Sequence, residues 1–371
     1  MKILLTNFHP SNGGGHTTYL KYLFQEFNKN DKVDICIACP EGSRLYKVCS
    51  EINQNNTFAI DFPSKISELS SVYKNTKILA ALIKKYNFDI VHVNGNPEHK
   101  MAMYCKLFYN LNFKIVRTKH ESKNIKNNFF TTIQYKYFMD KMIVVSNYQL
   151  NSINKKFILD KTIMIHNGVD LNYFKPKEKN QELIDKYKIS TNDIVFVSVA
   201  GTALHKGWQH LVKAIAELDD NLKNKIKIII AGNPPKEKIY EKYIKSNFME
   251  NHVVFTGLVD DVRDIISIGD IGFVLSTSIE TISFACREMM AMGKPVIASD
   301  YAGLPENIDN NLDGWIINTK ESDYLKKVIK DIVNNKNMVD NMSKHAKNKA
   351  YKEFSLDDFA NKTLKIYEKI L

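Results

Sequence analysis

The chain has 371 residues, of which 44% are hydrophobic and 25% are charged. This composition is typical of a soluble globular protein and excludes a disordered or fibrous one, while the length predicts two domains with a cleft between them. The net charge of +11 and the pI near 9.1 favour an anionic partner on electrostatic grounds.

The predicted elements alternate along the chain between short apolar runs and longer amphipathic stretches, a pattern that indicates βαβ units and parallel sheets. Predicted strands of the first half cover residues 2–6, 33–38, 89–94, 114–118, 142–146 and 162–166. Those of the second half cover 193–201, 226–232, 252–257, 271–276 and 295–300. We therefore predict an α/β fold of two doubly wound parallel sheets in tandem.

A polar, lysine-rich stretch containing Pro176 separates the two halves and has the composition of a linker. After about residue 320 the strands stop, and the remainder is predicted as two or three helices. Ser355, with Asp357 and Asp358, supplies a cap and an acidic first turn for the last helix.

Neither the N-terminus nor the cysteines indicate an extracellular protein. MKILLTNFHPSN turns polar too soon for a secretory signal, and no run of about 18 apolar residues is present, so we expect a cytoplasmic location. Five scattered cysteines argue against a disulfide framework. Cys36 and Cys39 form a CxxC, but no second Cys or His pair stands at ligand spacing, and we interpret both as buried core thiols.

Two turns between a predicted strand and helix carry residues suited to a phosphate. In SNGGGHTTYLKYLF, three glycines let the backbone approach a ligand at a helix N-terminus. In VSVAGTALHKGWQHLVKAI, Lys206 stands just before Gly207 and can neutralise a phosphate as a point charge. A flexible turn and a solvated lysine are the alternatives. The first turn matches neither the dinucleotide fingerprint GxGxxG nor a Walker loop.

The stretch ETISFACRE places Glu280 and Glu288 around the start of a helix predicted to begin near Thr281. Helical spacing predicts one buried stripe made of Ile282, Ala285, Cys286, Met289 and Met290. Glu280 has simple capping as its alternative role. That alternative is weaker for Glu288, whose neighbours are apolar.

Taken in order, these motifs resemble the retaining glycosyltransferases of family 4, which share the two-Rossmann-domain architecture called GT-B. The resemblance rests on GGGH (13–16), KIVRTKH ending at His120, VSNY (145–148), HNGVDLNYFKP (166–176), HKG (205–207), TGLVDDVRDIISIGDIGFVLSTSIE and ETISFACREMMAMGKPVIASDYAGLPE. It implies an acceptor-binding domain at 1–175, a nucleotide-sugar-binding domain at 176–352, and a C-terminal helix at 353–371 that packs back on the first domain.

The resemblance also implies roles for single residues. Glu288 binds the ribose hydroxyls of the nucleotide, and Glu280 lies near the hydroxyls of the transferred sugar. Lys206 neutralises the leaving nucleoside diphosphate, and His120 lies beside the reacting sugar. The implied diphosphate site is completed by the backbone of Gly14, Gly15, Thr281, Ile282 and Ser283.

One position departs from the family pattern. Thr202 stands where the family commonly carries an arginine, so the donor site lacks a second cation in its usual place. Arg263 and Arg287 are the candidates to compensate. We count Thr202 among the implied donor-binding residues.

The mechanism implied by the resemblance is transfer with retention. We find no carboxylate nucleophile of the kind used by retaining glycosidases and expect same-face substitution, in which the leaving diphosphate takes the acceptor proton. The sequence contains no D-x-D, and we expect neither a metal nor another cofactor. The alternatives are a GT-B epimerase or phosphorylase, or a non-catalytic nucleotide-sugar-binding protein. A nicotinamide-dependent dehydrogenase is excluded by the missing fingerprint.

Residues 101–141 form a basic, aromatic-rich segment that gives information on the binding partners. Eight Lys or Arg stand there against two acidic residues and are interleaved with aromatics. Either this is a solvated face over ordinary core residues, or the first domain touches an anionic membrane on its cytoplasmic side. No nucleic-acid recognition motif accompanies the charge. We expect a UDP-sugar as donor, with GDP-mannose next, and a glycan or lipid-linked acceptor in polysaccharide or glycolipid synthesis.

Overall fold

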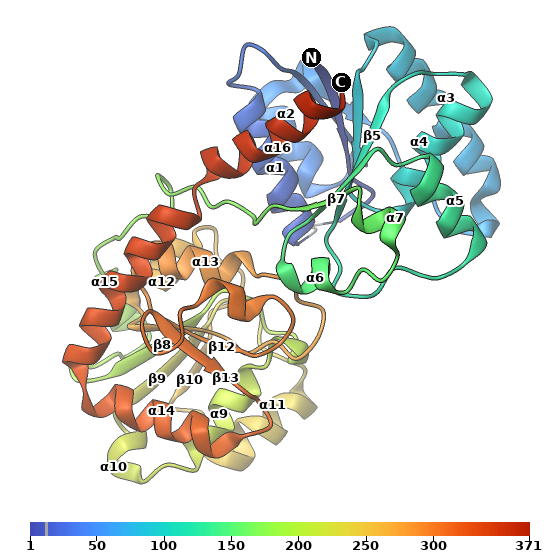
Figure 1. Cartoon of the computed structure of the whole chain (residues 1–371). Helices are drawn as coiled ribbons and strands as arrows, with labels where there is room; N and C mark the ends of the chain where they lie inside the picture. The colour runs from blue at the N-terminus through green and yellow to red at the C-terminus, as the bar shows by residue number, and fades with distance from the viewer. Residues whose placement is uncertain (12–13) are drawn as a thin grey trace. The chain divides into compact units, whose positions relative to one another are not determined.

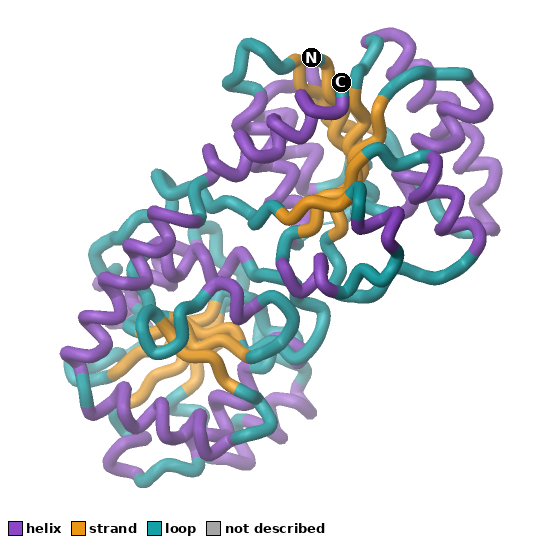
Figure 2. The backbone as a smooth tube through the Cα atoms, in the orientation of Figure 1, coloured by secondary structure: helices purple, strands orange, loops and turns teal. Residues whose placement is uncertain are grey.

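The structure is a computed structural model that describes residues 1–11 and 14–371, so Gly13 of the GGGH motif lies outside the described residues. These residues form two compact units, and each has a parallel sheet between helices (Figure 1, Figure 2). Unit 1 comprises Met1–Gly168 and Leu356–Leu371, and unit 2 comprises Val169–Ser355. The C-terminal segment therefore belongs to the same unit as the N-terminal half.

The sheet of unit 1 has seven strands among the described residues, in the order β3-β2-β1-β4-β5-β6-β7, and all neighbours are parallel. The strands are β1 (Lys2–Thr6), β2 (Asp34–Cys39), β3 (Thr57–Ala59), β4 (Ile90–Val93), β5 (Lys114–Lys119), β6 (Lys141–Val144) and β7 (Thr162–Met164). All four residues of β4 are buried, as expected for a strand covered by helices on both faces. The strand order reverses between β1 and β4, and ligands of such sheets bind beyond the carboxyl ends of the strands at this point.

The helices of unit 1 include the last one of the chain. They are α1 (Gly15–Phe27), α2 (Arg44–Asn53), α3 (Leu69–Tyr86), α4 (Asn96–Tyr109), α5 (Phe129–Tyr137), α6 (Asn147–Asn151), α7 (Lys156–Leu159) and α16 (Leu356–Ile370), with 3₁₀ turns η1 (Gln54–Asn56) and η2 (Ile66–Glu68). Helix α16 packs on α1, where the rings of Phe27 and Tyr367 lie 5.8 Å apart and those of Tyr19 and Phe359 lie 5.1 Å apart. This apolar contact holds the end of the chain on unit 1.

The sheet of unit 2 has six parallel strands among the described residues, in the order β10-β9-β8-β11-β12-β13. They are β8 (Ile194–Ser198), β9 (Ile226–Ile230), β10 (Val253–Phe255), β11 (Ile271–Val274), β12 (Val296–Ser299) and β13 (Gly314–Ile317). The order reverses between β8 and β11. The carboxyl ends of these two strands are thus the position where the fold favours a ligand.

The helices of unit 2 cover both faces of its sheet with two apolar clusters. They are α8 (Gln181–Lys186), α9 (Trp208–Ala216), α10 (Asp220–Lys223), α11 (Glu237–Tyr243), α12 (Val262–Ile268), α13 (Phe284–Ala291), α14 (Ser322–Asn334) and α15 (Lys336–Glu353), with 3₁₀ turns η3 (Leu204–Lys206), η4 (Lys245–Asn247) and η5 (Leu304–Asn307). Four residues of the predicted stripe, Ala285, Cys286, Met289 and Met290, are buried on α13, whereas Ile282 is buried but precedes the helix.

The predicted pair of doubly wound parallel sheets is confirmed, with two differences. The strands β3 and β13, which are short edge strands, were not predicted. The helix after Glu280 starts at Phe284, three residues later than predicted, because Ser283 takes a left-handed φ of +60° and caps α13. Cys36 and Cys39 are core thiols as predicted, and burial raises the pKa of both to about 12.

Among residues 1–11 and 14–371, no helix is both long and apolar enough to cross a membrane.

Candidate functional site

Lys206 is positioned by the turn that follows β8. The turn ends at Gly207, whose φ is +77° and where an added Cβ would lie 1.7 Å from the carbonyl oxygen of Leu275. Only glycine fits this close approach to the end of β11. The backbone N–H of Thr277 donates to the carbonyl of His205 at 2.9 Å, so the turns after β8 and β11 are tied together.

Glu280 lies in the turn that follows β11, and its carboxylate contacts the side chain of Lys206. Lys206 Nζ lies 2.9 Å from Glu280 Oε2, while the hydroxyl of Ser276 donates to the same oxygen at 3.4 Å. The N–H of Thr281 donates to Oε1 at 3.2 Å. The side chains of Lys206 and Glu280 are 22% and 13% exposed, so both charges can still meet a ligand. This cluster stands at the carboxyl ends of β8 and β11, the strand pair where the order reverses.

The backbone from Thr281 to Ser283 leads from this cluster into α13. Ser283 accepts a hydrogen bond from the N–H of Cys286 at 3.4 Å and so acts as the N-cap. Ile279 also has a left-handed φ, of +53°, which is unusual for a branched residue. The side chain of Ile282 is buried in the core. Two non-glycine residues in this conformation within five positions mark a backbone that is held by its surroundings.

Glu288 lies in the second turn of α13 and is partly exposed. It is separated along the helix from the Lys206–Glu280 pair by the buried Arg287 and Cys286. The two glutamates therefore differ in their surroundings, because Glu280 is ion-paired with a lysine and Glu288 is carried on the helix itself.

Thr202 and the two candidate arginines have structural contacts within unit 2. The carbonyl of Thr202 accepts a hydrogen bond from Trp208 Nε1 at 2.8 Å. Arg263 donates to the carboxylate of Asp261 and lies over the ring of Tyr173. Arg287 is fully buried, donates to Asn307 at 2.7 Å and stacks on Phe354, and burial lowers its pKa to about 10. Both guanidinium groups are therefore already engaged within unit 2.

In unit 1, the predicted glycines and histidine lie near the carboxyl ends of β1, β4 and β5. Gly14 is the N-cap of α1, and its carbonyl accepts hydrogen bonds from Thr17 and Thr18. Gly15 is the first residue of that helix. One residue on, the ring of His16 lies 4.2 Å from the ring of His120, between centroids. The glycine turn and the predicted histidine thus meet through His16.

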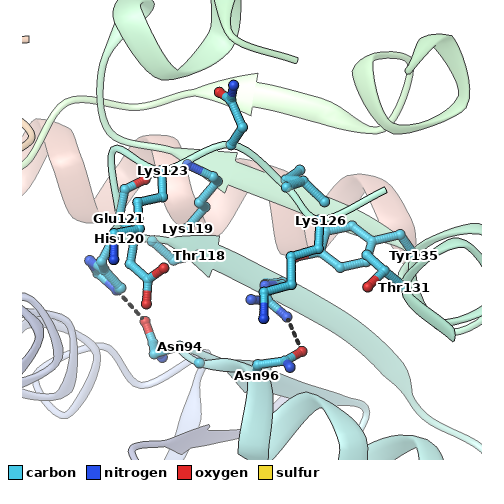
Figure 3. A pocket seen from close by; sticks show the side chains of 14 residues that line it. Asn94, Asn96, Thr118, Lys119, His120, Glu121, Lys123, Lys126, Thr131 and Tyr135 are labelled. Carbon is cyan, nitrogen blue, oxygen red and sulfur yellow. Dashed lines mark hydrogen bonds between the residues drawn. The ribbon is translucent and has the colours of Figure 1, made fainter. Parts of the chain in front are cut away.

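His120 is held by Asn94, which follows β4 (Figure 3). Asn94 donates its amide to the carbonyl of Thr6 at 3.1 Å, so its oxygen faces His120 and lies 2.8 Å from Nε2. His120 Nε2 therefore carries the proton and donates it to Asn94. Burial, with His16, His92, His9 and Arg117 adding to it, lowers the pKa of His120 well below its ordinary value. The imidazole is consequently neutral at physiological pH.

Asn94 and Ser276 were not predicted, although they orient two of the predicted residues. Asn94 is the first residue after β4 and Ser276 is the second after β11, and the strand order reverses at both strands. That position is a signal the sequence contains, because DIVHVN and IGFVLS end in these polar residues. Of the predicted residues, Lys206 and Glu280 are in contact, Thr281 to Ser283 follow directly, and Gly14, Gly15 and His120 belong to unit 1.

Comparison with protein families matches both halves of the chain. The model described as Glycosyltransferase Family 4 matches residues 13–173, and the model described as Glycosyl transferases group 1 matches residues 179–349. Together they cover most of the sequence.

Known proteins match along the whole length. An uncharacterised glycosyltransferase of Methanocaldococcus jannaschii is 24% identical over 395 residues, covering 100% of this chain and 98% of the relative. The UDP-Gal:alpha-D-GlcNAc-diphosphoundecaprenol alpha-1,3-galactosyltransferase of Escherichia coli is 23% identical, covering 92% and 91%. Among solved structures, the Anabaena protein HepE in complex with UDP has a TM-score of 0.81 at 17% identity, covering all of both chains. The last likeness shows the shared fold.

Proposed function

Because this chain belongs to the glycosyltransferases of the GT-B fold, we propose that it transfers a hexose or N-acetylhexosamine from a UDP-sugar, with retention, to a glycan or lipid-linked acceptor. UDP is favoured because HepE was solved with it and the E. coli relative is named for a UDP-sugar. The lipid-linked acceptor of that relative supports a role in polysaccharide or glycolipid synthesis.

The observation that carries this proposal is the Lys206–Glu280 pair at the carboxyl ends of β8 and β11. A lysine at this position can neutralise the diphosphate as the glycosidic bond breaks, and a carboxylate next to it can accept hydrogen bonds from two sugar hydroxyls. The backbone of Thr281, Ile282 and Ser283 then contributes N–H groups to the phosphates, and Glu288 takes the ribose hydroxyls.

The chemistry we propose is same-face substitution through an oxocarbenium-like state. The bond from the anomeric carbon to the diphosphate oxygen breaks, the acceptor oxygen bonds to the same face, and the acceptor proton passes to the departing diphosphate. Lys206 supplies the positive charge, so no metal is required. His120 takes part as a neutral imidazole, with the proton on Nε2 directed at Asn94.

Nucleotide binding tests the donor site. We expect UDP to raise the melting temperature and GDP to leave it nearly unchanged, because only the cognate nucleotide binds the folded protein tightly. The variants Lys206→Met and Glu288→Ala are each expected to weaken UDP binding about tenfold or more, because each removes a charged hydrogen-bonding partner. A shift by GDP alone would assign a guanine donor instead.

Glu280→Gln separates binding from transfer. The Glu280 carboxylate is ion-paired with Lys206 and would compete with UDP for it. Removing this charge should therefore leave UDP binding as tight as in the unaltered protein or tighter, while transfer from the UDP-sugar is lost. UDP binding by Lys206→Met as tight as that of the unaltered protein would overturn the donor site. Activity that a chelator abolished and manganese restored would overturn the metal-free mechanism.

We further propose that unit 1 rests on the inner, anionic face of the cytoplasmic membrane through residues 101–141. Four aromatic side chains there are between 66% and 76% exposed: Phe108, Phe129, Phe130 and Tyr137. Three of them lie on α5, which contacts α4, and the segment carries a charge of +6. Exposed rings beside cations suit a membrane interface.

Liposome flotation tests this contact. The protein is expected to float with vesicles that contain anionic lipid and to stay in solution with zwitterionic ones. The variant Lys136→Glu/Lys141→Glu should float less, whereas Lys84→Glu on α3 serves as the control. If flotation depended neither on the lipid charge nor on the Lys136→Glu/Lys141→Glu substitutions, residues 101–141 would be a solvated face and not a membrane contact.

A further inference from the structure

A polar pocket of about 300 Å³ lies within unit 1, beside His120 (Figure 3). Its floor is the turn from β4 into α4, Asn94 to Asn96, together with the end of β5. The loop after β5 forms one wall, and Thr131 and Tyr135 of α5 form the other. Figure 3 shows His120 and Glu121 at one end of the pocket and Thr131 and Tyr135 at the opposite end.

The lining of this pocket is strongly cationic. Arg117, Lys119, Lys123 and Lys126 stand against a single carboxylate, Glu121. Within the described parts of the chain, none of the four cations forms a salt bridge with an acidic side chain. An unpaired positive charge of this density inside a concave site attracts an anion.

Arg117 is held in place for such a contact. Its guanidinium lies 5.0 Å from the ring centroid of Tyr135, and Nη1 lies 3.0 Å from His99 Nδ1 and 3.5 Å from Asn96 Oδ1. Its Nε is buried and has no hydrogen-bond partner among the described residues. A planar guanidinium fixed by stacking binds phosphate with two parallel hydrogen bonds.

Two further features add to the attraction for an anion. Asn96 is the first residue of α4, which has 14 residues, so the positive end of a long helix dipole meets the pocket. The buried carboxyl of Glu98 lies against Gly95, which lines the pocket. Burial raises the pKa of Glu98 to about 8, so this group is largely neutral at pH 7 and adds little negative charge to that of Glu121.

We propose that this pocket is the acceptor subsite of unit 1 and that it binds a phosphate group of the acceptor, with Arg117, Lys123 and Lys126 as its ligands. The inference rests on the proposed function and narrows the acceptor to a phosphorylated one. A volume of about 300 Å³ holds a phosphate with an adjoining sugar or a short stretch of chain, so the phosphate comes either from a soluble sugar phosphate or from a lipid-linked phosphate.

Binding of defined probes to the full chain tests the pocket. Titration calorimetry with glucose 1-phosphate and with farnesyl phosphate, each against its unphosphorylated counterpart, glucose or farnesol, separates the two sources. Binding of glucose 1-phosphate assigns a soluble acceptor, and binding of farnesyl phosphate alone assigns a lipid-linked one. Either result supports the subsite. Equal affinity of a phosphorylated probe and its counterpart overturns it, as does the absence of binding by both phosphorylated probes.

Variants locate the binding in this pocket. Lys123→Gln/Lys126→Gln changes two exposed loop residues and should weaken binding of the phosphorylated probe about tenfold or more. Lys74→Gln/Lys77→Gln removes the same charge from exposed positions on α3 and should change it less than twofold. An equal loss of probe affinity in both double variants would mean that the phosphorylated probe is attracted non-specifically by the positive charge of the protein, and it would overturn the proposal. The UDP-induced shift of the melting temperature should be the same in all three proteins, so a failed donor site is recognised separately.

Discussion

Glu98 is a buried carboxyl whose replacement should stabilise the protein. It lies in the first turn of α4 and is completely buried in unit 1. Burial raises its pKa from 4.5 to about 8, while the positive charge of Arg117 opposes the shift. The folded state therefore holds a proton on Glu98 at pH 7, whereas the unfolded chain, with its ordinary pKa, does not.

The magnitude follows from proton linkage. The stabilisation from the bound proton is fully present below pH 4.5 and is lost as the pH rises through 8. Each pH unit in this window costs the folded protein about 1.4 kcal/mol relative to a neutral side chain. Glu98→Gln keeps the shape and cannot ionise. It should match the unaltered protein near pH 4.5 and exceed its free energy of unfolding by about 3 kcal/mol at pH 7 and by about 5 kcal/mol above pH 8.

Urea unfolding at several pH values between 4.5 and 8.5 provides the measurement. Far-ultraviolet circular dichroism follows both units, while tryptophan fluorescence follows unit 2, because Trp208 and Trp315, the two tryptophans of the chain, both lie there. Glu51→Gln, at an exposed position of α2, is the control and should stay within about 0.5 kcal/mol at every pH. A Glu98→Gln variant that is less stable at pH 7, or whose effect does not grow with pH, would refute a neutral Glu98.

Two further variants test the packing of each unit. Tyr367→Phe should destabilise unit 1 by about 1–3 kcal/mol in urea unfolding. The Tyr367 hydroxyl lies 2.5 Å from His92 Nδ1, and its removal leaves that buried nitrogen without a partner. The control Tyr351→Phe, at an exposed site, should have little effect. Gly207→Ala should lower the urea midpoint seen by tryptophan fluorescence by more than any other alanine in that turn, since its Cβ would overlap the Leu275 carbonyl. Gly201→Ala, in the same turn, has a φ of +94° but meets no atom within 4 Å, so it should lower the midpoint by less; tolerance of alanine at 207 would mean that the turn can move away from β11.

The central strands could be predicted because parallel strands buried on both faces consist of nearly continuous apolar residues. β9 reads IKIII and β4 reads IVHV, and both were found. β3 and β13 were not predicted because an edge strand of three or four residues needs few apolar positions. In addition, GWII, the sequence of β13, directly follows a polar turn. The helix start near Thr281 was wrong for another reason: a serine with a left-handed φ gives no periodic signal in the sequence.

The site shows the same limit at longer range. Lys206 and Glu280 were each singled out by the motifs around them, but 74 positions separate them, and no local pattern indicates that they form an ion pair. The pair follows from topology, since β8 and β11 are neighbours where the strand order reverses and the turn after each strand leaves at the same edge of the sheet. Gly207 then sets the spacing by letting one turn touch the end of the other strand.

This pairing changes how the two residues have to be considered. A lysine alone in a turn would attract any phosphate, and a glutamate alone at a helix entry would cap it or repel the donor. Together they form a nearly neutral pair in which Lys206 is already oriented and Glu280 is held by Ser276 and its own backbone neighbour. Under the proposed function, a diphosphate has to compete with Glu280 for the lysine, which weakens the binding of phosphate alone. A sugar hydroxyl that donates a hydrogen bond to Glu280 would offset this loss, so under the proposed function we expect the pair to bind an intact nucleotide sugar more tightly than the free nucleoside diphosphate.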